Sequence, residues 1–254
     1  MKIRLDELMV RCGIAPSRAR ARDAILRGHV TVNGKPVAKA GAPVDETADV
    51  SVDDPGLHYV SRGALKLIAA LDEFGVDPVG CRCLDIGAST GGFTQVLLES
   101  GANHVHAVDV GHGQLDPKVA ADCRVSNLEG LNARDLTLSH IGTPVDLIVA
   151  DVSFVSLKLA LDRALDLARP GARLAALIKP QFEVGRTGLG KGGIVRDPAL
   201  ATAAAEAIAD WIAGRDWQVT GLIRSPITGG DGNTEFLIGA RRADLVCKDS
   251  DANA

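Results

Sequence analysis

The chain has 254 residues, of which 46% are apolar and 24% are charged, and its formal net charge is −4. These values predict a soluble protein with a sizeable core, built as one large domain or as one domain with a small module. No run of about 18 apolar residues is present, and Asp6 and Glu7 interrupt the stretch where a secretion signal has its apolar core, so we expect a cytoplasmic protein without a membrane span.

The five cysteines have neither the density of a disulfide scaffold nor the spacing of a zinc site, so no metal site is expected. Charge is unevenly distributed, because residues 1–40 hold nine Lys or Arg against three acidic residues. A basic segment on an otherwise acidic chain predicts a local surface that binds a polyanion.

Two short helices and a hairpin are predicted in this basic segment. Apolar residues recur at helical spacing over residues 4–12. A second helix begins at the cap residue Ser17 and ends near Arg27, and its expected core positions are Ala19, Ala24, Ile25 and Leu26. The pair Asn33-Gly34 then predicts a tight turn between strands 29–32 and 35–37.

Basic side chains along this segment suit contacts with the phosphates of an RNA backbone. The candidate RNA-binding residues are Arg4, Arg18, Arg20, Arg22, Arg27 and Lys35. A solvated cationic helix without a ligand is the alternative interpretation. The run RLDELMVRCGIAPSRARARDAILRGHVTVNGK resembles the ribosomal-S4-like RNA-binding module, a small α+β unit. The resemblance covers about residues 3–55 and implies that the basic helix is presented to structured RNA.

From residue 61 onward, helical and strand patterns alternate, which is typical of an α/β fold with a mostly parallel sheet. A helix starting at Ser61 carries Lys66, which by default would be a solvated lysine. Further helices are expected at 156–168 and 197–213, and strands at 84–86, 104–110, 123–125, 145–150, 174–178, 217–224 and 234–239. We predict an S4-like domain at 1–55, a linker at 56–60, a second domain at 61–242 and a disordered tail at 243–254.

A glycine-rich turn, LDIGASTGGFTQVLL, joins the first strand of this second domain to a helix. Glycines allow a ligand to approach the backbone closely, and the helix N-terminus offers free N–H groups. Ser89 stands where a dinucleotide-binding turn has its second glycine, which argues against a pyrophosphate ligand. The turn instead suits S-adenosylmethionine, whose sulfonium is positively charged and whose amino-acid end is zwitterionic, and the acidic Asp85 would be a sensible partner for that end. A plain turn that needs glycines only for its backbone shape is the alternative.

Charged residues follow several of the predicted strands, at the edge where open α/β sheets bind ligands. Asp85, Asp109, Asp151 and Lys179 all occupy such positions. An antiparallel last strand would bring Glu235 to the same edge, and Lys66 could reach over it from the preceding helix. The sequence therefore predicts one cluster of Lys66, Asp151, Lys179 and Glu235 beside the glycine-rich turn.

Such a cluster suits methyl transfer to a ribose hydroxyl. The high pKa of a hydroxyl requires a base, or a cation that stabilises the developing alkoxide, and Lys179 is the candidate for this role. The sequence leaves open whether Lys179 is a neutral base or an ammonium. Alignment of hydroxyl oxygen, methyl and sulfur would supply most of the rate gain.

The segments SRGALKL, LDIGASTGGFT, DVSFVSL, LIKPQFE and GNTEFLIG, following an S4-like module, resemble the TlyA family over about residues 3–241. Its members have been called hemolysins but act as ribosomal RNA ribose 2′-O-methyltransferases similar to FtsJ/RrmJ-type enzymes. The resemblance implies an α/β, Rossmann-like S-adenosylmethionine-dependent methyltransferase sheet of seven strands, the last antiparallel, and methylation of cytidine in ribosomal RNA of one or both subunits.

The same resemblance assigns the site residues. The catalytic tetrad would be Lys66, Asp151, Lys179 and Glu235. The expected contacts with S-adenosylmethionine are Asp85, Gly87, Ser89, Thr90, Gly91, Gly92, Phe93 and Asp109, with Asn132 on the adenine side. The partners would be ribosomal RNA or ribosomal subunits.

Other readings of the chain remain open. GRTGLGKG at 185–192 nearly matches a phosphate-binding loop but lacks its final hydroxyl residue, and we interpret it as a substrate-facing flap. Arg4-Leu5-Asp6 matches a pseudouridine synthase signature but is expected to serve packing and solvation. The rival functions are a pore-forming hemolysin and an RNA-binding protein without catalysis.

Overall fold

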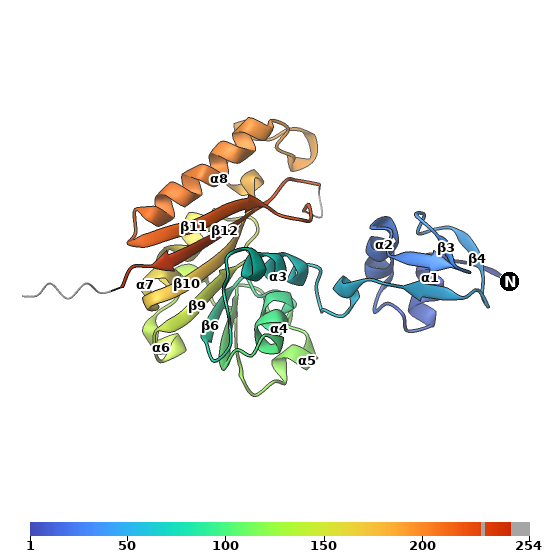
Figure 1. Cartoon of the computed structure of the whole chain (residues 1–254), viewed down its shortest axis with the longest axis horizontal. Helices are drawn as coiled ribbons and strands as arrows, with labels where there is room; N and C mark the ends of the chain where they lie inside the picture. The colour runs from blue at the N-terminus through green and yellow to red at the C-terminus, as the bar shows by residue number, and fades with distance from the viewer. Residues whose placement is uncertain (230–231, 245–254) are drawn as a thin grey trace, which may run out of the picture. The chain divides into compact units, whose positions relative to one another are not determined.

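The computed structural model describes residues 1–229 and 232–244 and divides into two compact units, Met1–Arg62 and Gly63 onward (Figure 1). The predicted linker, residues 56–60, belongs to the first unit, because the guanidinium of Arg20 donates hydrogen bonds to the carbonyls of Gly56 and Tyr59. Of the predicted disordered tail, residues 245–254 lie outside the described residues.

The first unit contains two helices, α1 (Leu5–Arg11) and α2 (Arg18–Leu26), and a short 3-10 turn at Pro55–Leu57. Its strands are short: β1 (Lys2–Arg4), β2 (Val30–Val32), β3 (Lys35–Pro36), β4 (Pro43–Asp45) and β5 (Val50–Val52). β1 pairs with β4, and β2 lies between β3 and β5, all antiparallel.

Local signals in this unit behave as the sequence predicts, except on one helix face. Ser17 caps α2 by accepting a hydrogen bond from the backbone of Arg20, and Asn33 and Gly34 both have positive φ in the hairpin turn. The predicted core positions Ala19 and Leu26 are wrong, since both are exposed. The buried face is Ala21, Ala24 and Ile25, which recur at the i, i+3, i+4 spacing of a helix that buries one stripe.

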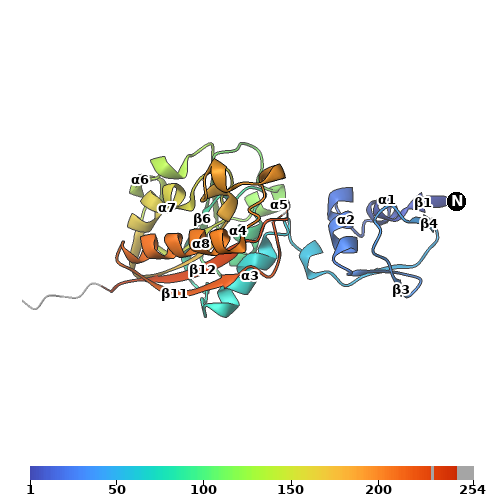
Figure 2. The ribbon, with the colours of Figure 1, turned by 90° about the horizontal axis from the view of Figure 1, so that it is seen from above.

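The second unit is a seven-stranded sheet covered by helices on both faces (Figures 1 and 2). In spatial order its strands are β11 (Trp217–Arg224), β12 (Phe236–Arg242), β10 (Ala168–Ile178), β9 (Val145–Ala150), β6 (Arg82–Ile86), β7 (His104–Asp109) and β8 (Val125–Glu129). β12 runs antiparallel to both of its neighbours, β10 and β11, as predicted for the last strand. The fold class is therefore confirmed.

Helices α3 (Ala64–Glu73) and α4 (Gly92–Glu99) pack together against the sheet, and α7 (Leu157–Asp166) and α8 (Pro198–Ala213) form a second such pair. The remaining helical segments are short: α5 (Pro117–Ala120), α6 (Leu138–Ile141) and 3-10 turns at Ala133–Asp135, Pro180–Phe182, Arg186–Gly188 and Lys191–Gly193. The predicted alanine-rich helix α8 buries Ala201, Ala205, Ile208 and Ile212 in the main core, as expected of a packed helix.

One strand begins later than the sequence indicated. A strand was predicted around Cys123–Val125, whereas β8 starts at Val125 and pairs with β7 from Val105 to Asp109. The reason is a turn in which Asp122 accepts hydrogen bonds from the backbone and the guanidinium of Arg124. Glu129 is the last residue of β8 and lies directly opposite Asp109.

Candidate active site

The glycine-rich turn connects β6 to α4 and brings two strands close together. Gly87 has φ +82°, and a Cβ there would lie 2.5 Å from the carbonyl oxygen of Asp151, the residue directly after β9. Gly91 has φ +94° directly before α4, and a Cβ there would lie 2.7 Å from the side chain of Leu115. Glycine is therefore required at both positions by conformation and by space.

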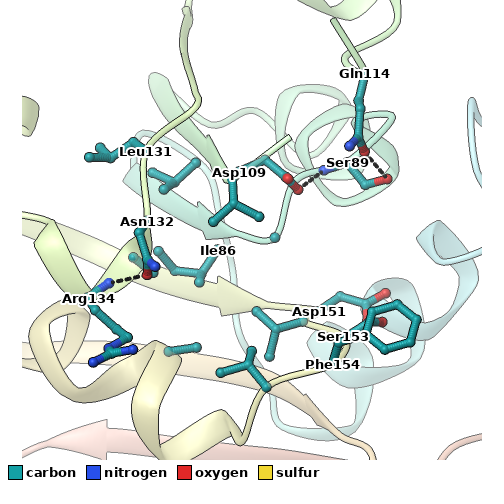
Figure 3. Close-up of a pocket in the computed structure, with 17 residues that line it drawn as sticks. Ile86, Ser89, Asp109, Gln114, Leu131, Asn132, Arg134, Asp151, Ser153 and Phe154 are labelled. Carbon is teal, nitrogen blue, oxygen red and sulfur yellow. Dashed lines mark hydrogen bonds between the residues drawn. The ribbon is translucent and has the colours of Figure 1, made fainter. Parts of the chain in front are cut away.

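Beside this turn lies a cavity of about 400 Å³, within the range of about 300–1,000 Å³ that small-molecule sites occupy (Figure 3). Its lining includes the predicted residues Gly87, Ser89, Asp109, Asn132 and Asp151. Apolar side chains of the carboxyl ends of the strands supply much of the remaining wall, among them Ile86, Val108, Leu131 and Val152.

Asp109 and Asn132, two of the predicted polar residues in the cavity lining, also accept hydrogen bonds from nearby backbone N–H groups. The carboxylate of Asp109 accepts hydrogen bonds from the backbone N–H of Ser89 at 2.8 Å and of Gly111 at 2.7 Å, so it joins the glycine-rich turn to the loop after β7 (Figure 3). The side-chain oxygen of Asn132 accepts from the backbone N–H of Arg134 at 3.0 Å. Both side chains therefore enter the cavity from fixed positions.

The other predicted cofactor contacts do not line this cavity. Asp85 is completely buried within β6 and accepts a hydrogen bond from the Thr94 hydroxyl at 2.7 Å, and burial raises its pKa to about 7. The remaining predicted contacts, which form or adjoin the start of α4, are Thr90, Gly91, Gly92 and Phe93. Their predicted contacts with a cofactor stay predictions.

The four residues predicted as a catalytic tetrad form two ion pairs. Lys66 and Glu235 pair with each other, with only 7% and 3% of their side chains exposed. The Nζ of Lys179 lies 2.6 Å from Asp151 Oδ1 and donates a hydrogen bond to Ser153 Oγ at 2.9 Å. The two pairs are electrostatically coupled: burial and Asp151 raise the pKa of Glu235, whereas Lys66 and Lys179 oppose that rise.

A second cavity, of about 450 Å³, lies against the tetrad and contains Lys179 and Glu235 in its lining. Ser153 and Phe154 line both cavities, so the two adjoin. Phe154 is 91% exposed, has φ +65° and lies with its ring 5.3 Å from that of Phe182. An exposed aromatic side chain on such a backbone is uncommon and indicates a functional constraint.

Sequence reasoning did not assign three residues that the structure places at the site: Gln114, Ser153 and Phe154. For Ser153 and Phe154 a signal was available, since both follow Asp151 directly at the carboxyl end of β9. Gln114 carried no comparable signal, because it lies in the middle of a loop. The segment interpreted as a flap contributes Leu189 and Gly192 to the second cavity, together with the adjacent Gly193.

The six candidate RNA-binding residues separate into two groups. Arg4 and Arg18 are half exposed, and together with the exposed Arg22 they line a surface hollow; Lys35 is exposed on β3. Arg20 and Arg27 instead hold the unit together: Arg20 bonds backbone carbonyls, and Arg27 pairs with Asp23 at 3.0 Å and Asp54 at 2.5 Å.

A further basic residue, Lys39, lines the same hollow and was not predicted. The carboxylate of Asp6 is buried beneath it and accepts hydrogen bonds from Arg4 and Arg18. Within Arg4-Leu5-Asp6, Leu5 is buried in the core of the unit and Arg4 pairs with Asp6, and the packing and solvation role of the signature stays a prediction.

Comparisons with known proteins agree with this geometry. An FtsJ-like methyltransferase model matches residues 59–242, and an S4 domain model matches residues 3–50. The chain is 45% identical to the 16S/23S rRNA (cytidine-2′-O)-methyltransferase TlyA of Mycobacterium tuberculosis, over 94% of this chain and 90% of that protein. It is 39% identical to hemolysin A of Brachyspira hyodysenteriae, over 92% of this chain and 98% of that protein.

Among solved structures, a protein of Streptococcus thermophilus provisionally named a hemolysin is 38% identical and superimposes with a TM-score of 0.74, covering 96% of this chain and 89% of that one. Within residues 1–229 and 232–244, no helix is both long enough and apolar enough to cross a membrane.

Proposed function

The chain belongs to the TlyA family of FtsJ-like methyltransferases that carry an S4 domain, and from that premise we propose that it methylates the 2′-hydroxyl of a cytidine ribose in ribosomal RNA, with S-adenosylmethionine as methyl donor. One observation carries the proposal: of the paired charges Lys66–Glu235 and Lys179–Asp151, Asp151 lines the first cavity and Lys179 and Glu235 line the second, which adjoins it. A cytoplasmic location follows from this substrate.

The residues of the first cavity fit the proposed methyl donor. Gly87 lets the turn after β6 lie directly against the backbone of Asp151, where a side chain would collide, and both residues line the cavity. Asp109 offers carboxylate oxygens for ribose hydroxyls, and Asn132 with the neighbouring apolar side chains suits an adenine ring. When bound, the donor supplies an electrophilic methyl group on a sulfonium.

The second cavity suits the nucleotide that is methylated. Its wall contains Lys179, whose ammonium is fixed between Asp151 and Ser153 and has N–H capacity left for a substrate oxygen. As the bond from the 2′-oxygen to the methyl carbon forms, the carbon–sulfur bond breaks and its electron pair stays on sulfur, which leaves a neutral thioether. The hydroxyl proton passes to solvent water, and Lys179 stabilises the negative charge that develops on the oxygen. The buried pair Lys66–Glu235 keeps one positive and one negative charge at fixed positions beside Lys179 and Asp151.

The exposed ring of Phe154 supports the choice of a nucleic-acid substrate. It stands where the two cavities meet, beside Phe182, and an aromatic face at that point offers a stacking surface for one base taken out of its helix. The chain has eight aromatic Phe, Trp and Tyr residues in all, so wider recognition relies on RNA shape and phosphates.

The S4 domain provides the phosphate contacts in this proposal. Arg4, Arg18, Arg22 and Lys39 surround one hollow of the first unit and present cationic groups to solvent. Binding through such groups releases counterions, so affinity for RNA should fall steeply as salt rises.

Transfer of tritium from labelled S-adenosylmethionine to ribosomal subunits and to naked ribosomal RNA tests the proposal. We expect label in RNA with the wild type and with the control variant Lys158→Ala on α7, and loss of label with Lys179→Ala. Absence of label on every RNA substrate, with S-adenosylhomocysteine still bound, would favour the alternative of RNA binding without catalysis.

A further inference from the structure

The carboxylate of Glu129, which has had no role so far, accepts hydrogen bonds from three backbone N–H groups of one loop. It ends β8 directly opposite Asp109. One carboxylate oxygen accepts from the backbone N–H of Gln114 at 2.6 Å and of Leu115 at 2.9 Å, and the other accepts from the backbone N–H of Gly113 at 2.9 Å. Three consecutive amides of the loop after β7 thus converge on one carboxylate.

This loop forms part of the wall of the first cavity. It carries Gln114, whose side chain lies in the cavity lining and accepts a hydrogen bond from the Ser89 hydroxyl at 3.3 Å (Figure 3). It also carries Leu115, which packs against Gly91 at the start of α4. A shift of the loop would therefore change both the cavity wall and the contact with the glycine-rich turn.

The loop is held at two points by two neighbouring carboxylates. Asp109 fixes the beginning of the loop by accepting a hydrogen bond from the backbone N–H of Gly111. The carbonyl of Gly111 in turn accepts a hydrogen bond from the backbone N–H of Gly130. Glu129 fixes the other end, and it is not among the residues that line the cavity. Its effect on a ligand must therefore pass through the loop.

A carboxylate is the side chain that this position needs. A carboxylate only accepts hydrogen bonds, whereas an amide would direct N–H groups at some of the three donors. The backbone amides of Leu115, Gln114 and Gly113 lower the pKa of Glu129 to about 2, so the group is ionised throughout the neutral range.

We propose that Glu129 is a positioning residue for the methyl donor. Glu129 fixes the loop Gly111–Leu115, which forms part of the wall of the donor cavity. The inference rests on the proposed function, since it takes the first cavity as the donor site. It assigns to Glu129 control of donor affinity, without a part in the transfer step or in RNA binding.

The test measures S-adenosylhomocysteine affinity by calorimetry for the wild type, Glu129→Ala, Glu129→Gln and the control Glu206→Gln, which changes an exposed glutamate of α8. We expect the dissociation constant to rise about tenfold in Glu129→Ala, and less in Glu129→Gln because one acceptor oxygen remains. The KM for the donor should rise in parallel, while kcat at saturating donor and the KM for RNA stay as in the wild type. Hydrogen exchange should quicken at residues 111–115 in particular.

Several results would overturn the inference. If residues 111–115 exchange faster in Glu129→Ala while S-adenosylhomocysteine binds as in the wild type, loop order does not govern donor affinity. If kcat falls and the donor KM does not change, Glu129 acts on the transfer step. If Glu129→Ala does not fold, Glu129→Gln supplies the same comparison. Failure of the wild type itself to bind S-adenosylhomocysteine would remove the proposed function together with the inference.

Discussion

The candidate sites of the two units use the same residue types, basic side chains paired with carboxylates, but the basic side chains differ in burial. In the first unit Arg18 is 56% exposed and reaches out from Asp6 to solvent. In the second unit Lys66 is 7% exposed and pairs with an equally buried Glu235. Exposed pairs contribute little to stability and remain available to a polyanion, whereas buried pairs depend strongly on both partners. Under the proposed function, this difference in burial assigns RNA affinity to the first unit and chemistry to the second.

The largest effect is expected from Lys179→Ala. Loss of a positioned cation next to the reacting oxygen should lower kcat about 10²–10³-fold. Affinity for RNA and for S-adenosylhomocysteine should stay at the wild-type level, because Lys179 stands at the tetrad and outside the S4 domain. Single-turnover methyl transfer measures the chemical step, and filter binding measures the RNA. A parallel loss of RNA affinity would erase the distinction between the two units.

Breaking the buried pair should cost stability as well as activity. Lys66→Met leaves Glu235 buried without its partner, which typically costs about 3–5 kcal/mol. The double variant Lys66→Met/Glu235→Leu replaces both charges with apolar side chains and should recover most of that stability while remaining inactive. Denaturant unfolding of the two variants decides the matter. If the single variant is as stable as the double variant, Glu235 without Lys66 is not a destabilising buried charge.

The stability of the protein should also depend on Asp85. Burial raises its pKa from 3.8 to about 7, so the folded state keeps a proton that the unfolded state releases. This contribution is full below about pH 4 and is lost as the pH rises through about 7, at about 1.4 kcal/mol per pH unit. Asp85→Asn should therefore melt above the wild type at pH 8 and lose that advantage near pH 5. The same difference in melting temperature between Asp85→Asn and the wild type at both pH values would contradict this prediction.

The smallest effects are expected in the S4 domain, and they should differ between its two groups of arginines. Arg22→Ala should weaken RNA binding and reduce the slope of log affinity against log salt by about 1. Arg27→Ala should lower the melting temperature and leave that slope unchanged, because Arg27 pairs with Asp23 and Asp54. Equal slopes in both variants would show that the separation of the two groups is wrong.

The sequence was sufficient wherever a residue's role depended on its place along a strand. Asp151 and Lys179 follow apolar strands β9 and β10 directly, so their meeting at one sheet edge was predictable. It was not sufficient where side chains decide local geometry. The turn made by Asp122 and Arg124 occupies residues that were predicted as strand, and β8 runs from Val125 to Glu129, which pairs with Asp109.

Tertiary partners account for the remaining differences. Arg20 and Arg27 have the same sequence character as Arg18 and Arg22, and only the fold shows that the first two bond to residues 54–59. In the sequence, Phe154 likewise has no feature that distinguishes it from other apolar residues that follow a strand. Its exposure, and its place between two cavities, follow from the backbone conformation after β9.

The most direct test of the account is to digest ribosomal RNA after reaction with the wild type, Lys179→Ala and Lys158→Ala, and to analyse its nucleosides by mass spectrometry. At equal, short reaction times the account predicts 2′-O-methylcytidine with the wild type and with Lys158→Ala, and about 10²–10³-fold less of it with Lys179→Ala. A methyl group found on the base, or 2′-O-methylcytidine formed equally by all three proteins, would contradict it.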